Sequence, residues 1–328
     1  MHPFSYVQVE DAAAALQAAG QHSDAAFFAG GTTLIDLMKL DVMTPAALVD
    51  INHLPFSSIE SGPDGITIGA NVRNSDLAHN PLVRESFPVL SEALLAGASA
   101  QLRNMASTAG NLMQRTRCGY FRDVNAACNK RQPGSGCDAI TGFNRMHAVL
   151  GTSEHCVATH PSDMCVGLMA LDAVVHTRQQ DGTKREIPLK EFYLLPGETP
   201  ERETVLGKGE LITKVFLPGD SMGQRSHYLK VRDRSSYEFA LASAAVALEV
   251  RGKKIVRARV ALGGVGTVPW RSLEAESVLV GKAAGRATFT AAAEAALAQA
   301  KPLEHNAFKV DLAKRTLVLA LEELIARA

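Results

Sequence analysis

All five cysteines of this 328-residue chain lie between residues 118 and 165. Four of them follow the pattern C-x9-C-x8-C-x18-C, and they are Cys118, Cys128, Cys137 and Cys156. The residues between them lack apolar periodicity and contain turn signals such as Pro133-Gly134-Ser135-Gly136, so the sequence predicts a long loop. A long loop inside a compact domain needs support, and a metal bound at four points supplies it.

The charge around these cysteines is unusual for the chain. Between residues 111 and 147 six Arg and Lys residues stand against two Asp residues, a surplus of four in a chain of zero formal net charge. Cations favour thiolates over thiols and offset the charge of a thiolate-bound cluster. Structural zinc ligands usually come in close Cys pairs, which are absent here, whereas iron–sulfur clusters accept more varied spacing. The residues therefore favour an iron–sulfur cluster and leave zinc, disulfides or unliganded thiols open.

Other residues near the cysteines are weaker candidates for a metal. His147, His155 and His160 flank the four cysteines, but four thiols already complete a ligand set. Cys165 lies in an apolar run, which predicts a buried hydrophobic role. The sequence contains no Walker or H-E-x-x-H motif and no supported Ser-His-Asp arrangement, so it predicts a cofactor carrier more than an acid–base enzyme.

The length and composition, with 46% hydrophobic and 21% charged residues, are those of a globular protein of two or three domains. The balanced charge argues against nucleic-acid binding. The longest apolar stretch, Phe239 to Leu248, is too short to span a membrane. The N-terminus lacks the features of a signal peptide, so we expect synthesis in the cytoplasm without an export signal. Thiols stay reduced there, which favours a metal site over disulfides.

The first fifty residues predict a strand–turn–helix–strand unit. We expect a strand at 6–9, a helix at 11–19, a strand at 25–29, and the turn Gly30-Gly31. A capping box, Thr33-x-x-Asp36, would open a helix through residue 39, and a strand follows at 47–51. The glycines allow backbone amides to approach a phosphate closely. The alternative is a tight turn that only requires positive φ.

The later residues predict a mixture of strands and helices. Residues 104–111 are nearly all small, which suits either contact with an extended ligand or close packing of elements. By period two, Tyr228, Lys230, Arg232 and Arg234 share one face of a strand, which is either solvated or lines a pocket. We expect a strand at 65–70, helices at 88–100 and 164–172, antiparallel strands within 173–220, a strand at 260–266, and helices at 287–300 and 311–328 with apolar Leu312, Leu319 and Leu324.

At Ala29-Gly30-Gly31-Thr32-Thr33 and Ser107-Thr108-Ala109-Gly110-Asn111 the chain resembles the FAD-binding medium subunit of the molybdenum hydroxylases, the xanthine dehydrogenase family. The likeness continues through Ser162-Asp163, Lys230 and the C-terminal Gly-Gly-Val-Gly strand. The strings AGGTTLIDLMKL, STAGNLMQRTRC, CNKRQPGSGC and KVRDRSSYEFAL are most similar to the FAD subunits of bacterial periplasmic aldehyde oxidoreductases.

This resemblance implies an α+β fold. Its first part, residues 1–220, would be a two-subdomain FAD-binding region of the vanillyl-alcohol-oxidase (PCMH) type, divided at about 1–55 and 56–220. A 4Fe-4S-binding insertion would occupy about 112–160. Residues 221–328 would form a C-terminal α+β domain like that of the CO dehydrogenase flavoprotein.

The resemblance also implies a set of site residues. The expected FAD contacts are Phe27, Phe28, Ala29, Gly30, Gly31, Thr32, Thr33, Leu34, Ser107, Thr108, Gly110, Asn111, Asp163, Ile212 and Lys230, and the expected 4Fe-4S ligands are Cys118, Cys128, Cys137 and Cys156. Ala109 replaces a glycine usual in the family. Between Asn111 and Asp163 lie 51 residues, many more than most members have, and the excess is the cysteine loop.

The function implied is electron transfer within a heterotrimer that oxidises aldehydes. A large subunit would carry molybdopterin, a small subunit 2Fe-2S clusters, and FAD on this chain would pass electrons to an external acceptor. No catalytic residue is expected here. The resemblance implies a periplasmic location, reached by co-export with a signal-bearing partner. The alternatives are the flavin subunit of an enzyme like 4-hydroxybenzoyl-CoA reductase or xanthine dehydrogenase, or, in another class, a zinc-stabilised adaptor without flavin.

Overall fold

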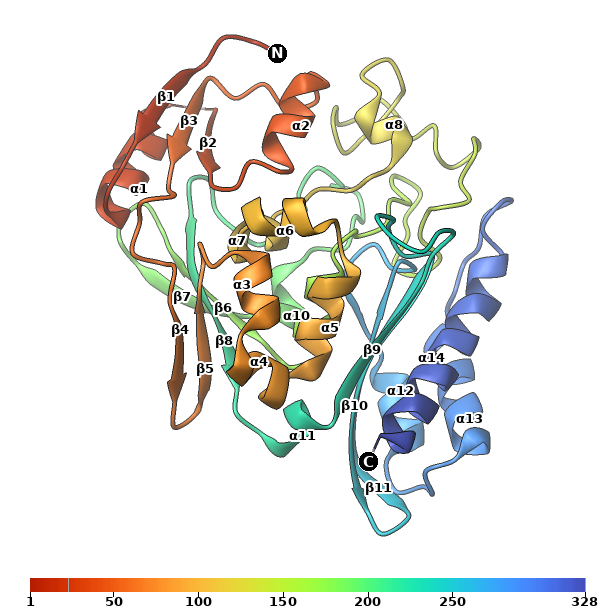
Figure 1. Ribbon diagram of the computed structural model, residues 1–328. Coiled ribbons are helices and arrows are strands. Elements are labelled where there is room, and N and C mark those ends of the chain that lie inside the picture. The colour runs from red at the N-terminus through yellow and green to blue at the C-terminus, as the bar shows by residue number, and fades with distance from the viewer. Residues whose placement is uncertain (23, 328) are drawn as a thin grey trace.

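The computed structural model describes residues 1–22 and 24–327, and its strands form three separate sheets (Figure 1). The first sheet is parallel, in the order β1-β3-β2. Its elements are β1 (Ser5–Gln8), α1 (Ala12–Gln21), β2 (Ala25–Phe28), α2 (Leu34–Lys39) and β3 (Ala47–Asp50). Because α2 connects the parallel neighbours β2 and β3, the predicted strand–turn–helix–strand unit is confirmed.

The second sheet is antiparallel, in the order β4-β5-β8-β6-β7, which confirms the strands predicted within 173–220. Its strands are β4 (Ile59–Gly62), β5 (Gly65–Gly69), β6 (Val174–Arg178), β7 (Lys184–Pro188) and β8 (Leu211–Pro218). Between β5 and β6 the chain forms α3 (Asn74–His79), α4 (Pro81–Ser86), α5 (Pro88–Ala96), α6 (Ala100–Met105), α7 (Thr108–Leu112), α8 (Gly119–Arg122) and α9 (Asp163–Ala170), and α10 (Leu189–Phe192) follows β7.

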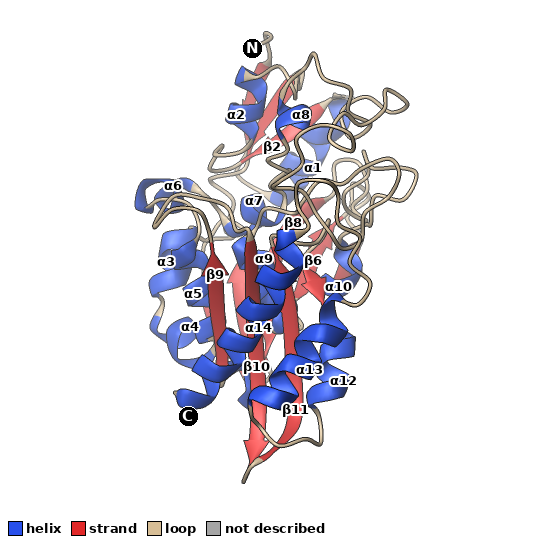
Figure 2. Cartoon of the chain, turned by 90° about the vertical axis from the view of Figure 1, so that its right-hand side faces the viewer, coloured by secondary structure: helices blue, strands red, loops and turns tan. Residues whose placement is uncertain are grey.

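The third sheet is antiparallel, in the order β12-β11-β10-β9, and helices cover both of its faces. Its elements are α11 (Ser221–Gln224), β9 (Ser226–Val231), β10 (Ala242–Arg251), β11 (Lys254–Gly263), β12 (Trp270–Arg271), α12 (Leu273–Leu279), α13 (Arg286–Leu297) and α14 (Phe308–Ala326). In Figure 2 the helices α12 to α14 lie in front of these strands. Val246 packs on that side, whereas Ala245 joins the core around α5 and α9. The apolar run noted in the sequence is therefore a strand buried on both faces.

Two local predictions in the first part of the chain need correction. The helix predicted at 88–100 forms but ends at Ala96, because Ala98 has a φ of 52° and Ser99 starts the next helix, α6, by accepting a hydrogen bond from the amide of Leu102 at 3.3 Å. The capping box at Thr33 does not form either, since Thr33 makes no side-chain cap. The Asp36 carboxylate instead binds both terminal nitrogens of Arg122, at 2.8 and 3.0 Å, so a tertiary ion pair replaces the local one.

The C-terminal predictions also need correction. β9 ends at Val231, so Arg232 and Arg234 lie in the turn beyond it and not on the strand face. Leu324 is buried and Leu312 packs partly buried against the same core, as predicted, but Leu319 is 45% exposed, and Leu317 and Leu321 lie on the buried face of α14. Helix α12 (Leu273–Leu279) was not predicted from the sequence. The last helix ends at Ala326, and Ala328 lies outside the described residues.

The cysteine segment is a loop, as predicted, with α8 as its single helical turn. Near the end of this loop, residues 146–148 accept hydrogen bonds from side chains of the C-terminal region. The fully buried ammonium of Lys309 donates to the carbonyls of Met146 at 3.1 Å, His147 at 3.0 Å and Gly264 at 2.5 Å. Asn306 Nδ2 donates to the carbonyls of His147 and Ala148, both at 3.3 Å. The loop and the C-terminal region therefore share one packed junction.

The connections between the sheets run through residues 51–58 and 219–225. The domain limits at about 55 and 220, and the insertion at about 112–160, stay predictions. None of the helices within residues 1–22 and 24–327 combines the length and apolar character that crossing a membrane requires.

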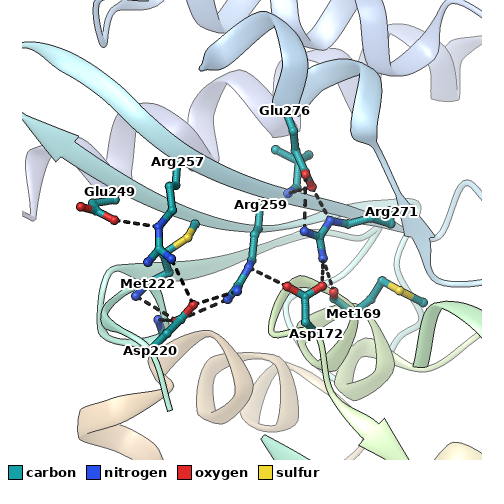
Figure 3. Close-up of polar contacts among 11 residues, drawn as sticks. Met169, Asp172, Asp220, Met222, Glu249, Arg257, Arg259, Arg271 and Glu276 are labelled. Atoms are coloured by element: carbon teal, nitrogen blue, oxygen red, sulfur yellow. Dashed lines mark hydrogen bonds and ion pairs between the residues drawn. The ribbon is translucent and has the colours of Figure 1, made fainter. Parts of the chain in front are cut away.

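An ion-pair network fastens the third sheet to the end of α9 (Figure 3). Arg259 on β11 binds Asp172 and Asp220, each at 2.8 Å. Arg271 on β12 binds the same Asp172 at 2.7 Å and donates to the Met169 carbonyl at 2.7 Å. Arg259 is mostly buried, with 15% of its side chain exposed, so its partners cannot be replaced fully by water.

We expect Arg259→Met to lower the free energy of unfolding by about 1–2 kcal/mol, because Asp172 and Asp220 lose a shared cation. Urea denaturation monitored by circular dichroism measures the change. Arg286→Met is the matched control, since Arg286 pairs with Glu322 but has 77% of its side chain exposed. The control should change stability by less than about 0.5 kcal/mol. Equal effects of the two substitutions would contradict a role for this network in joining the domains.

Candidate functional site

The two small-residue turns of the sequence meet each other in space. A Cβ on Gly30 would stand 1.9 Å from the carbonyl oxygen of Met105, so only glycine permits this approach of the two backbones. Gly31 has a φ of 70°, a conformation that also favours glycine. The glycines are therefore required by the contact between the turns, which brings residues 29–34 beside residues 105–111.

A cavity of about 600 Å³ opens beside this contact. Thr32 and Thr33 line it from the first turn, and Gly110 and Asn111 from the second. The second turn is firmly held. The Ser107 hydroxyl accepts from the amide of Gly110 at 3.2 Å, and the buried Thr108 hydroxyl donates to the carbonyl of Val72 at 3.0 Å.

Asn111 links the second turn to the residues beyond the cysteine loop. Its side-chain oxygen accepts a hydrogen bond from the hydroxyl of Ser162 at 2.6 Å. The Ser162 hydroxyl in turn accepts from the amide of Cys165 at 3.1 Å and so caps α9. The end of the cysteine loop therefore lies beside its start, and Asp163, which follows the loop, lines the cavity.

Asp163 and Lys230 form a buried ion pair on this wall. Lys230 Nζ lies 2.8 Å from Asp163 Oδ2, with only 3% and 9% of the two side chains exposed. Tyr228, two residues earlier on β9, donates its hydroxyl to Asp163 Oδ1 at 2.5 Å. Burial and the neighbouring carboxylate raise the pKa of Tyr228 well above its usual value. Of the basic residues predicted to share this strand face, Lys230 therefore lines a cavity and is not exposed to solvent.

The predicted FAD contacts fall into two groups. Six of them line the cavity: Thr32, Thr33, Gly110, Asn111, Asp163 and Lys230. The others, Phe27, Phe28, Ala29, Gly30, Gly31, Leu34, Ser107 and Thr108, build the two turns and their flanks, and Ile212 is 5% exposed in the core beside β6. The role of every one of these residues as a FAD contact stays a prediction.

Several lining residues were missed by the sequence analysis. Asn74, Arg103, Arg117, Tyr237 and Phe239 all line the cavity. Tyr237 and Phe239 are large and exposed, at 55% and 39%, in the turn after β9, and no periodic pattern marks them in the sequence. Arg117 directly precedes Cys118, and this position beside a predicted cluster ligand could have marked Arg117 as a site residue.

The lining has unused hydrogen-bonding capacity, which suits a polar ligand. Within the described residues, Asn74 Oδ1 and Arg103 Nε are buried without a hydrogen-bond partner. A buried polar atom without a partner costs free energy, and a bound ligand or water removes that cost. The glycine contact, the cavity and these atoms together fit an extended dinucleotide.

Two of the four cysteines of the predicted cluster, Cys128 and Cys137, are paired in an isolated antiparallel bridge. Burial raises the pKa of Cys118 to about 12, and Cys128 and Cys156 add to the rise. Burial, with a contribution from Cys128, also raises the pKa of Cys137. Backbone amides donate toward these sulfurs, those of Tyr120 and Phe121 toward Cys118 and that of Ala139 toward Cys137. Largely buried thiols that accept hydrogen bonds from backbone amides fit an iron–sulfur cluster.

The four sulfurs are free thiols in the structure. Within residues 1–22 and 24–327 no three His, Cys, Asp or Glu side chains are grouped as a single metal ion would need. The assignment of Cys118, Cys128, Cys137 and Cys156 as cluster ligands therefore stays a prediction. Cys165 is fully buried, as predicted, with its sulfur 3.0 Å from the hydroxyl of Tyr193.

The cysteine loop packs against the helix that follows the first turn. Phe121 and Cys128 share a small apolar core with Leu37 of α2. The Arg122–Asp36 ion pair lies beside this core. A second cavity, of about 440 Å³, reaches Cys118 and shares Arg117, Pro161, Asp163, Glu238 and Phe239 with the first. The dinucleotide cavity and the cysteine loop are therefore adjacent parts of one site.

His160 is buried between these parts. Its Nδ1 accepts from the amide of Ser162 at 3.3 Å, and its ring packs edge-on against Tyr193 at 4.6 Å between centroids. Burial lowers the pKa of His160 from 6.5 to about 3, so the folded protein keeps the ring neutral. Between these values the unfolded chain binds the proton and the folded chain does not, so stability falls as the pH falls below 6.5.

We expect the wild type to lose on the order of 2 kcal/mol of stability through His160 between pH 6.5 and pH 5. His160→Gln should reduce that loss, because glutamine does not titrate. Urea denaturation at the two pH values measures both proteins. His147, whose pKa burial lowers to about 4, leaves part of the acid sensitivity in the variant. An unchanged pH dependence in His160→Gln would contradict the assignment.

Comparison with known proteins accounts for the whole chain. Residues 2–220 match the FAD binding domain in molybdopterin dehydrogenase, and residues 226–324 match the CO dehydrogenase flavoprotein C-terminal domain. The aldehyde oxidoreductase FAD-binding subunit PaoB of Escherichia coli is 51% identical over 100% of both chains. The glyceraldehyde dehydrogenase medium chain of Sulfolobus acidocaldarius is 29% identical over 86% of this chain and 83% of its own.

The fold agrees with these matches. A structure of carbon monoxide dehydrogenase from Hydrogenophaga pseudoflava superimposes with a TM-score of 0.78, at 26% identity and with 100% of both chains covered. The predicted α+β class, with a flavin-binding region followed by a CO-dehydrogenase-flavoprotein-like domain, is thereby confirmed. The chain belongs to the FAD-binding medium subunits of the molybdenum hydroxylase family.

Proposed function

We propose that this chain is the electron-transfer subunit of a molybdenum-dependent aldehyde oxidoreductase and carries both FAD and a 4Fe-4S cluster. The observation that carries the proposal is the meeting of the two small-residue turns at one cavity, directly beside a four-cysteine loop. The full-length similarity to an aldehyde oxidoreductase subunit supports aldehydes as the substrate class of the assembly.

The chain's own residues hold the dinucleotide in this proposal. Gly30 and Gly31 let the first turn come close to the pyrophosphate, and Gly110 and Asn111 complete the opposite side. The Asp163–Lys230 pair supplies a fixed charge pair on the wall that the C-terminal domain closes. Bound FAD supplies the chemistry that joins one-electron donors to an acceptor of electron pairs.

Cys118, Cys128, Cys137 and Cys156 hold the 4Fe-4S cluster in this proposal. Cys128 and Cys156 are buried and Cys118 and Cys137 are partly buried, and backbone amides stabilise the sulfurs of Cys118 and Cys137 once deprotonated. Lys130 brings a cation near Cys156 and lowers the pKa of that thiol against the effect of burial. Lys130 is held in turn by Glu203 at 2.9 Å and by the carbonyl of Pro200 at 2.8 Å. The loop thus orients a positive charge toward the cluster.

The proposal extends to partners and location. A molybdopterin-binding large subunit and a 2Fe-2S small subunit complete a heterotrimer and deliver electrons to this chain. An external acceptor removes them. The assembly is periplasmic, and this chain is exported with a signal-bearing partner. The similarity to an Escherichia coli protein named as a subunit of an aldehyde oxidoreductase supports the assembly with other subunits. The periplasmic location rests on the resemblance of the sequence strings alone.

The absorbance spectrum of the purified protein tests the cofactors. We expect flavin bands on top of broad iron–sulfur absorption, and release of FAD on denaturation. A colourless protein with stoichiometric zinc would contradict the proposal and support the zinc-stabilised adaptor instead.

We expect Cys128→Ser to lose cluster iron, because a serine hydroxyl is a poor replacement for a buried thiolate ligand. The yield of soluble assembly should fall with it, since the loop loses the support that the cluster gives. Iron analysis and size-exclusion chromatography measure both effects. Cys165→Ala is the matched control, because Cys165 is equally buried but outside the ligand set, and it should retain iron. Full iron content in Cys128→Ser would show that the ligand assignment is wrong.

A further inference from the structure

Arg117 is a cation at the junction of the two cavities, and its side chain lines both. Its terminal nitrogens lie 2.9 Å from the carbonyl of Arg115 and 3.5 Å from the hydroxyl of Thr33. The ring of Phe239 lies 5.3 Å from the guanidinium carbon. None of these neighbours carries a negative charge.

The carboxylates nearby are already committed to other cations. Asp36 binds Arg122 through both of its oxygens, Asp163 binds Lys230 at 2.8 Å, and Glu238 binds Arg234 at 3.2 Å. Burial, together with repulsion from Arg122, lowers the pKa of Arg117, and attraction by Asp36 and Tyr237 offsets part of this effect. A largely buried guanidinium whose nitrogens bind no carboxylate directly is costly, so an anion beside it is favoured.

The position of Arg117 indicates which anion this is. Thr33 belongs to the first glycine turn, and Thr32, Thr33 and Arg117 line the same cavity. Guanidinium groups bind phosphate oxygens through two parallel hydrogen bonds. We propose that Arg117 of the cysteine loop binds the pyrophosphate of the dinucleotide that the glycine turn holds, which rests on the proposed FAD site.

This assignment links the two cofactors. Arg117 immediately precedes Cys118, the first proposed cluster ligand, and Arg122, four residues after Cys118, holds α2 through Asp36. A loop ordered by its cluster places the Arg117 guanidinium, and a bound dinucleotide favours the same arrangement.

The test measures FAD affinity in the intact holoprotein with the subunits that copurify. FAD is removed with a chaotropic salt and titrated back, and quenching of flavin fluorescence gives the Kd. We expect Arg117→Met to raise the Kd for FAD about 10- to 100-fold, the loss typical of a hydrogen-bonded charge pair. Arg117→Lys should restore part of the affinity. Arg286→Met, which removes the same charge on exposed α13, should leave the Kd unchanged.

Two further readouts separate this role from a merely structural one. The iron content of Arg117→Met should equal that of the wild type. The inhibition constant of ADP, which carries the pyrophosphate without the flavin, should rise by the same factor as the Kd for FAD in Arg117→Met. An unchanged Kd for FAD, a parallel loss of iron, or an unchanged inhibition constant of ADP would each overturn the proposal. Absence of FAD from the wild type would instead overturn the proposed function.

Discussion

The contact between α2 and the cysteine loop is the constraint on which the rest of the site depends. It combines the bidentate Asp36–Arg122 ion pair with a small apolar core of Leu37, Phe121 and Cys128. Because α2 directly follows the glycine turn, this contact fixes that turn from one side. The approach of Gly30 to the carbonyl of Met105 fixes it from the other. The cavity is thus shaped by packing between segments far apart in the sequence.

The C-terminal domain closes the same site. It contributes Lys230 to the cavity wall, and it anchors the returning half of the cysteine loop through Lys309, whose ammonium binds three backbone carbonyls. The ion pairs of Arg259 and Arg271 with Asp172 hold this domain on α9, the helix that starts at Asp163 (Figure 3). The cavity is therefore bounded by the turn and helix after β2, by the helices between β5 and β6, by the cysteine loop, and by β9 with the turn that follows it.

Local sequence patterns were sufficient for much of this arrangement. Glycines, short apolar runs and turn residues predicted the parallel unit around Gly30-Gly31, and the lack of periodicity predicted the cysteine loop. Local patterns gave wrong predictions where a side chain binds a residue far away in the sequence and not the expected neighbour. Asp36 leaves its predicted cap for Arg122, and Lys230 turns inward because Asp163 is brought to it across the fold. Tyr237 and Phe239 were missed because nothing in their sequence neighbours predicts a cavity, whereas Arg117 was missed although it directly precedes Cys118.

Hydrogen–deuterium exchange measured by mass spectrometry tests most directly whether the cysteine loop supports the glycine turn. The comparison is between the holoprotein and the same protein after its iron is removed with a chelator. We predict faster exchange in the loop at 113–162 and, together with it, in α2 (Leu34–Lys39). Faster exchange confined to the loop, with α2 unchanged, would contradict the account.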